Sequence, residues 1–265
     1  MIKKLNENKI LWLINSILSL IVALIGVFNP NVYNKVILQE LIPGVLYQDV
    51  TTIIASIITL ILTVRIKEED SKLQIIILGI LGYFFYAYGI YVIERVYTIL
   101  YFAYMAILGL SFFSMVIFVA SIRQEILKDI KQTKSIQYAS VGYLLFVSAV
   151  FYLLWIIQLL PLILSGNRID FYYSIYILDL CFVFPAFIII AVMTAKNENL
   201  GLLLIPAPLV FGFTLLFPLA LGEIFKPLLF NLPMDLGGML LFLCVSSAFL
   251  ILAIVYLQNL TLNPQ

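Results

Sequence analysis

The chain alternates long apolar runs with short charged segments, such as residues 65–72 and 123–134. An α-helix needs about 20 mostly apolar residues to cross the hydrocarbon core of a bilayer. The apolar runs have this length, and the charges between them mark where the chain leaves the membrane. The pattern predicts eight transmembrane helices, at residues 10–28, 47–65, 73–94, 97–122, 137–164, 171–195, 200–224 and 235–258.

The composition agrees with this pattern. Of the 265 residues, 64% are hydrophobic and only 11% are charged, whereas a soluble domain has about 25% charged residues. Lipid must therefore cover much of the surface. We expect an all-α fold, a polytopic transmembrane helix bundle that forms a single transmembrane domain over residues 1–265. The lipid bilayer of the cell membrane is the expected partner, nucleic acid is not, and the oligomeric state stays open.

The positions of the basic residues predict the orientation. With the N-terminus in the cytoplasm, only four of the 15 Lys and Arg residues lie on the outer side, namely Lys35, Arg95, Arg168 and Lys226. Basic residues accumulate in cytoplasmic loops, so both termini are expected inside. Segment 124–136 has helically spaced apolar residues among its charges, and it is expected to be either a short surface helix or a solvated loop.

Two further features concern the helices themselves. Prolines at positions 185, 206, 208 and 218 are expected to break the sixth and seventh spans. The second half also echoes the first at an offset of about 130 residues, which predicts repeat halves 1–123 and 137–265 related by a parallel four-plus-four repeat. The matched pairs are Pro30 with Pro161, Asp49 with Asp179, and Glu94 with Glu223.

Acidic residues inside two spans are the strongest functional signal, because a charge in the membrane is costly unless it is paired or hydrated. Asp49 begins a polar face of the second span that continues through Thr52, Ser56, Thr59 and Thr63 at helical spacing. Asp179 shares a face of the sixth span with Tyr172 and Tyr176. We expect both acids to face the bundle interior in its outer third, and at least one, with Asp179 favoured, to carry a proton near neutral pH.

Tyrosines of the third span, together with Tyr97, Tyr101 and Tyr104 along one face of the fourth, lie at the same expected depth as these acids. Together they predict an outward-facing acidic and tyrosine pocket for a small solute, a cation or a proton. The candidate ligand-binding residues are Gln48, Asp49, Thr52, Tyr88, Tyr91, Tyr176 and Asp179. The alternative is that the tyrosines anchor the protein at the interface and that Asp49 caps its helix.

The absent residues and motifs narrow the chemistry. The chain has no histidine and only two cysteines, in separate spans and without a C-x-x-C spacing, so we expect no metal and no cofactor. No G-x-x-x-x-G-K-[ST], H-E-x-x-H or G-x-S-x-G motif occurs. These observations favour a transporter-like binding protein over an enzyme. Two alternatives stay open: an intramembrane enzyme that uses paired carboxylates, and a non-catalytic membrane assembly subunit.

Three stretches of the chain resemble a family of uncharacterised prokaryotic multi-span membrane proteins. They are residues 41–49 (LIPGVLYQD), 81–91 (LGYFFYAYGIY) and 178–186 (LDLCFVFPA). In that family a Gln-Asp pair opens the second span and a Leu-Asp-Leu run lies in a late span. The resemblance implies importance for Gln48, Asp49 and Asp179, and it implies no particular activity.

Overall fold

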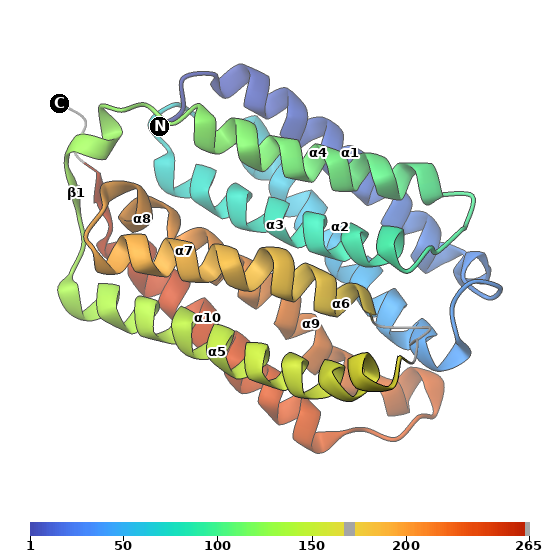
Figure 1. The fold of residues 1–265 in the computed structure, drawn as a ribbon. Helices are drawn as coiled ribbons and strands as arrows, with labels where there is room; N and C mark the ends of the chain where they lie inside the picture. The colour runs from blue at the N-terminus through green and yellow to red at the C-terminus, as the bar shows by residue number, and fades with distance from the viewer. Residues whose placement is uncertain (167–172, 263–265) are drawn as a thin grey trace.

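The computed structural model describes residues 1–166 and 173–262, which form a bundle of long helices (Figure 1). Eight helical segments in this part of the chain are long and apolar enough to cross a membrane, which confirms the predicted all-α transmembrane architecture. The helices and strands are α1 (Leu5–Phe28), α2 (Ile42–Arg65), α3 (Ser71–Ile93), α4 (Tyr101–Ala120), β1 (Ile130–Lys131), α5 (Lys134–Ser165), α6 (Tyr173–Leu178), α7 (Phe184–Ala195), α8 (Asn199–Leu204), α9 (Pro206–Phe230), α10 (Leu236–Asn259) and β2 (Thr261–Leu262). Short 3-10 turns lie at Pro30–Val32, Gln39–Leu41 and Ile126–Lys128.

Helix α2 begins earlier than the apolar pattern predicts, at Ile42 rather than at residue 47. Pro43 lies in its first turn, where the missing N–H group of proline costs nothing and its fixed φ suits the helix. Asp49 is therefore about 10 Å along the helix axis from the first residue of α2. The alternative in which Asp49 caps its helix is wrong, because the residue lies in the body of α2.

The prolines of the later spans have different effects. Pro206 begins α9 directly after the short helix α8, and Pro185 lies in the first turn of α7 after a π-helical turn at Asp179–Val183. The expected break occurs at Pro206, where Ile205 forms a one-residue turn, whereas at Pro185 the π-helical turn distorts the span without breaking it. At Pro208 and Pro218 the helix α9 continues, so the predicted breaks there are wrong. Proline is tolerated within membrane helices where neighbouring helices and local adjustments satisfy the freed carbonyl groups.

Segment 124–136 is not a surface helix. It holds a single 3-10 turn and then strand β1, which pairs antiparallel with β2. Ile130 of β1 is buried, so the apolar residues of this segment contribute to the core without forming an amphipathic helix. The pairing joins the connection between α4 and α5 to the segment that follows α10.

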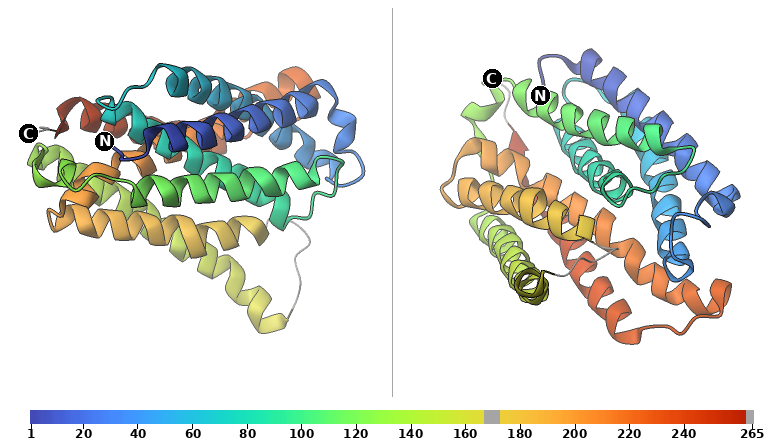
Figure 2. Two further views of the ribbon diagram at one scale, coloured as in Figure 1. Left: turned by 90° about the horizontal axis from the view of Figure 1, so that it is seen from above. Right: turned by 45° about the vertical axis from the view of Figure 1, so that its right-hand side comes forward.

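The spans form two groups that meet at the centre of the bundle (Figures 1 and 2). In the first group, α1 packs against α2 and α4, and α3 packs against α4 and α2. In the second group, α5 packs against α7 and α10, and α9 packs against α10. Helices α3 and α9 pack against each other and join the groups. Accordingly, 72% of the most apolar stretch of α3 is buried, against 11% for α5.

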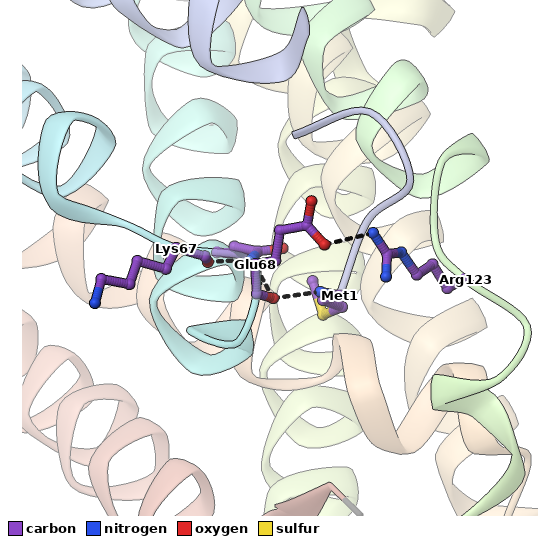
Figure 3. Close-up of polar contacts among 5 residues, drawn as sticks. Met1, Lys67, Glu68 and Arg123 are labelled. Carbon is purple, nitrogen blue, oxygen red and sulfur yellow. Dashed lines mark hydrogen bonds and ion pairs between the residues drawn. The ribbon is translucent and has the colours of Figure 1, made fainter. Parts of the chain in front are cut away.

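The N-terminal residues and β1 lie at the same end of the bundle (Figure 1). Figure 3 shows a cluster at this end in which the backbone nitrogen of Met1 donates to the Glu68 carbonyl over 2.7 Å and Arg123 binds the Glu68 carboxylate over 2.6 Å. Ile2 also pairs with Ile122 as an isolated β-bridge. We call this cluster the terminal clasp. The basic residues predict that it faces the cytoplasm, so we call this end the inner end.

Candidate functional site

Asp49 is buried within the first group of helices, and only 1% of its surface is exposed. The polar face that it begins points the same way, since Thr52, Ser56, Thr59 and Thr63 are each at most 1% exposed. The prediction that this face avoids lipid is confirmed. The 3.6-residue period of the helix brings all five side chains to the side of α2 that packs inside the bundle.

Two tyrosine hydroxyls hold the Asp49 carboxylate. Tyr33 donates to Oδ2 over 2.7 Å, and Tyr91 donates to Oδ1 over 3.2 Å. Tyr33 comes from the loop between α1 and α2, whereas Tyr91 lies near the outer end of α3. Gly26 of α1 lies against the same carboxylate, since a Cβ atom there would overlap both Asp49 Oδ2 and the Tyr33 hydroxyl.

Further tyrosines surround these two. Tyr91 stacks on Tyr104 of α4 with ring centroids 4.8 Å apart, and Tyr88 packs against both rings. We call Tyr33, Tyr88, Tyr91 and Tyr104 the tyrosine cluster; each is at most 3% exposed. Burial, and then the nearby Asp49 carboxylate, raise the pKa of Tyr33 well above its ordinary value. Tyr33 therefore stays protonated and remains a hydrogen-bond donor.

Asp49 has no cationic side chain as a partner among the described residues. The ion pairs there join other groups, such as Glu68 with Arg123 and Glu223 with Lys226. An anionic carboxylate in a low-dielectric interior is costly unless a charge of opposite sign compensates it. Two neutral hydroxyl groups lower this cost but do not remove it. The site is thus suited to take up a positive species, either a proton or a small cation.

A groove of about 230 Å³ lies at the outer surface beside the tyrosine cluster, formed by the loop that carries Tyr33 and by the connection between α3 and α4. Its lining residues are Asn31, Val32, Lys35, Val36, Tyr97, Thr98 and Ile99. Thr98 donates a hydrogen bond to the Tyr104 hydroxyl over 3.1 Å. Tyr104 in turn stacks on Tyr91, which binds Asp49, so the groove lies next to the site although the carboxylate itself is closed off from solvent.

Gln48 and Thr52 lie beside Asp49 but bind helix α3. The Gln48 side-chain amide donates to the Ala87 carbonyl over 3.0 Å, and the hydroxyls of Thr52 and Tyr83 are hydrogen-bonded at 2.8 Å. Tyr83 also donates to the Gln48 carbonyl over 3.0 Å. These contacts fix α2 against α3 and so position the Asp49 carboxylate between Tyr33 and Tyr91.

Asp179 has a separate set of partners. It is 7% exposed and accepts a hydrogen bond from the Trp155 indole over 2.8 Å, and Tyr86 of α3 lies beside it. Tyr176 packs edge-on against the Trp155 ring and donates to Gln158 rather than to Asp179. The expectation that both acids are buried is confirmed, but the hydrogen-bond partners of Asp49 and Asp179 have no residue in common. Tyr172 and Arg168 lie outside the described residues.

Two residues of the site do not follow from the apolar pattern. Tyr33 lies in a loop with no helical periodicity. Gly26 carries no side chain to attract notice. The one available signal for Tyr33 is its loop position directly before the span that carries Asp49. Only the folding back of this loop over the end of α3 brings its hydroxyl to the carboxylate.

The chain matches no family model, and comparison with curated proteins and with solved structures found no match. The eight apolar helices confirm the coarser part of the resemblance described above, a membrane protein with several spans. The finer likeness, to a family with a Gln-Asp pair and a Leu-Asp-Leu run, stays a prediction. The function is therefore argued from the geometry of the site.

Proposed function

We propose that this protein is a membrane transport protein that binds a proton or a small cation at Asp49. The observation that carries the proposal is a carboxylate 1% exposed, held by two hydroxyl groups, and without a basic partner among the described residues. A buried acid in a transmembrane helix commonly marks an ion or proton pathway. The groove at the outer surface gives the direction from which the positive species enters.

The tyrosine cluster suits either species. Tyrosine oxygens accept as well as donate hydrogen bonds, so they stabilise both the neutral carboxyl and the carboxylate. Four aromatic rings close to one acid also present negative π-faces to a cation. Because the cluster closes over Asp49, entry from the outer groove requires Tyr33 or Tyr104 to move. The loop that carries Tyr33 is the element best placed for this movement, since it is not part of the helical bundle.

The alternatives receive less support. An enzyme using paired carboxylates needs both acids at one place, and Asp49 and Asp179 bind different residues. An assembly subunit would use an exposed face, and the exposed apolar residues of α5 are equally suited to lipid. Neither alternative function explains why Asp49 is enclosed by tyrosines beneath a surface groove.

Infrared spectroscopy of the purified protein in lipid nanodiscs tests the proposal. The carboxyl C=O band is followed against pH, with and without a series of monovalent cations. We expect a protonated carboxyl near neutral pH, or a carboxylate band that shifts with one cation, and we expect Asp49→Asn to remove that signal. Asp179→Asn is the matched control, because it changes a second buried acid outside the tyrosine cluster.

Uptake into proteoliposomes provides the second readout. Asp49→Asn should abolish the pH-driven or cation-driven flux, whereas Asp179→Asn should retain it. If the spectra and the fluxes of Asp49→Asn equal those of the unmodified protein, Asp49 is not the binding group and the proposal is wrong.

A further inference from the structure

Buried polar side chains lie on α1, α2, α3 and α4, on the inner side of Asp49. Each of them is at most 7% exposed. They are Asn8, Asn15, Ser16 and Ser19 of α1, Ser56, Thr59 and Thr63 of α2, Gln74 of α3, and Ser111, Ser114 and Ser121 of α4. We call this set the polar column. Only its α2 members were predicted from the sequence, although Asn8, Asn15 and Ser19 of α1 and Ser111, Ser114 and Ser121 of α4 also follow helical spacing.

Two side-chain hydrogen bonds join members of the column on α1 and α4. The Asn15 amide donates to Ser111 Oγ over 2.9 Å, and the Asn8 amide donates to Ser121 Oγ over 3.4 Å. At the outer end, Tyr88 of the tyrosine cluster donates to the Ser19 carbonyl over 3.2 Å. The column thus begins directly at the site that contains Asp49.

The column nearly crosses the membrane. Gly26, which touches Asp49, and Asn8 lie on the same helix, 18 residues apart in the numbering. At 1.5 Å per residue this corresponds to about 27 Å, against a hydrocarbon core of about 30 Å. At the inner end, the Gln74 amide donates to the carbonyls of Lys67 and Glu68. The column therefore ends at the terminal clasp, where Figure 3 shows the Glu68 carboxylate beside Arg123.

Several polar atoms of the column have no hydrogen-bond partner in the part of the chain that the structure describes. They are Oδ1 of Asn8 and Asn15, Oε1 of Gln74, and Oγ of Ser16, Ser19, Ser56 and Ser114. Leaving one such group unsatisfied costs about 1–3 kcal/mol. Buried polar groups in native proteins bind internal water when no side chain or backbone group satisfies them.

Helix packing alone does not explain these residues. Small residues allow membrane helices to approach closely, and threonine often satisfies itself, as Thr59 and Thr63 do by donating to the carbonyls four residues earlier. The unpartnered serines make no such bond. Asparagine is neither small nor apolar, and leucine would fill the same volume without the cost of burying an amide.

We propose that the polar column binds a file of internal water molecules and relays protons between Asp49 and the inner end of the bundle. The inference rests on the proposed function and names the proton as the transported species. Asp49 is the group that takes up the proton beneath the outer groove. The unpartnered atoms on all four helices position the water molecules, and the terminal clasp marks the inner exit.

Each step is a proton transfer without any redox change. The O–H bond of the neutral Asp49 carboxyl breaks as a water molecule of the file forms a new O–H bond with that proton. Each water then passes one of its own protons to the next, and the last releases a proton to solvent at the inner end. Asp49 is left as a carboxylate and is reprotonated from the outer side. The titratable groups around it are the tyrosine cluster and Tyr83, which remain neutral donors and acceptors.

The same geometry disfavours a larger ion. The direct bonds from Asn15 to Ser111 and from Asn8 to Ser121 bridge α1 and α4 across the column. Trp12 and Phe118 pack together between these two levels, with ring centroids 6.1 Å apart. A hydrated cation would have to break these contacts, whereas a proton moves by rearranging hydrogen bonds.

Proton flux into proteoliposomes with an entrapped pH-sensitive dye tests the relay, with a K⁺ diffusion potential as the driving force. Asn15→Leu and Ser56→Val replace column groups with apolar ones, and each should reduce the flux at least about tenfold, as expected if the lost water contact raises the barrier by 1.4 kcal/mol. Ser140→Val is the matched control, because Ser140 is also buried and unpartnered but lies on α5, outside the column. It should conduct like the unmodified protein.

The infrared signal of Asp49 separates the two proposals and verifies folding. A variant that loses flux but keeps the Asp49 signal supports the relay. If Asn15→Leu and Ser56→Val conduct normally while Asp49→Asn does not, the relay is wrong and the proposed function stands. If the unmodified protein shows the Asp49 signal but no proton flux, the relay is likewise wrong. If Asp49→Asn changes neither signal nor flux, both proposals fail.

Discussion

The absence of a Cβ atom at residue 26 determines how closely α1 approaches the Asp49 carboxylate. Gly26 lies where any Cβ atom would meet Asp49 Oδ2 and the Tyr33 hydroxyl. The helix gains backbone stability from almost any residue other than glycine, so this glycine is best explained by the space it leaves. It allows one carboxylate oxygen and one phenol oxygen to form their hydrogen bond directly against α1.

Gly26→Ala should therefore destabilise the protein and displace the carboxylate. Overpacking of this kind costs about 1–3 kcal/mol, and the displaced Asp49 should lose its infrared signal. The measurement is thermal unfolding in detergent together with the infrared titration. Gly109→Ala is the control, because α4 leaves open space around Gly109, and it should be neutral or slightly stabilising. Equal behaviour of the two variants would refute the close-packing argument.

At this scale the sequence predicts the helical part of the site and misses the rest. Asp49 and the threonines and serine after it follow a 3.6-residue period, so their shared face could be read directly. Tyr33 reaches Asp49 through a loop, and no local pattern describes where a loop folds back. Asp179 was correctly expected to be buried. Its hydrogen bond from Trp155, however, depends on how α5 packs beside α6, and the periodicity of a single helix carries no information about such packing.

Among the elements, α3 is the one on which the others depend. It packs against α2, α4, α6 and α9. Its contact with α9 is close enough that a Cβ at Gly79 would lie 2.7 Å from the Ala207 carbonyl oxygen. A backbone atom cannot move aside as a flexible side chain can, so the two helices would have to separate.

Gly79→Ala should accordingly lower stability by about 1–3 kcal/mol and weaken the junction between the two groups of helices. Gly142→Ala on α5 has open space around it, and it should change stability little or raise it by up to about 1 kcal/mol. Thermal unfolding and limited proteolysis in the same detergent compare the two. A Gly79→Ala protein as stable as Gly142→Ala would show that α3 and α9 are less tightly packed than described.

The elements also show why span boundaries are harder to predict than span number. Hydropathy places eight spans correctly because each must satisfy the same bilayer thickness. It starts α2 too late because Pro43 and Gly44 lower the apolar signal of a turn that is helical. Segment 124–136 was ambiguous because its partner, β2, lies more than a hundred residues away in the chain.

For the whole molecule, the orientation in the membrane is the first quantity to measure. In a background with Cys181 and Cys244 replaced by serine, Lys35→Cys in the outer groove should react with a membrane-impermeant maleimide in intact cells. Lys128→Cys, near β1, should react only after permeabilisation, because the basic residues favour an inner location for that end. The reverse labelling pattern would place the groove on the cytoplasmic side, so that the proposed proton path through Asp49 would run in the opposite direction across the membrane.

At the scale of the whole molecule, we propose that halves 1–123 and 137–265 are related by an internal duplication. Several contacts of the first group have counterparts in the second: α1 with α2 and α5 with α7, α3 with α4 and α9 with α10, and α1 with α4 and α5 with α10. Helices α3 and α9 occupy equivalent places at the centre. The polar chemistry differs, however, because the tyrosine cluster lies beside Asp49 alone.

The unequal burial of α3 and α5 also has a consequence for how this protein diverges over time. A helix that mostly faces lipid is constrained only to be apolar and long, so substitutions among leucine, isoleucine, valine and phenylalanine in α5 should be nearly free. A helix enclosed on all sides, as α3 is, can change only where its neighbours change with it. Lineages that descend from a common ancestor should therefore retain recognisable sequence along α3 and around Asp49 long after α5 has become unrecognisable.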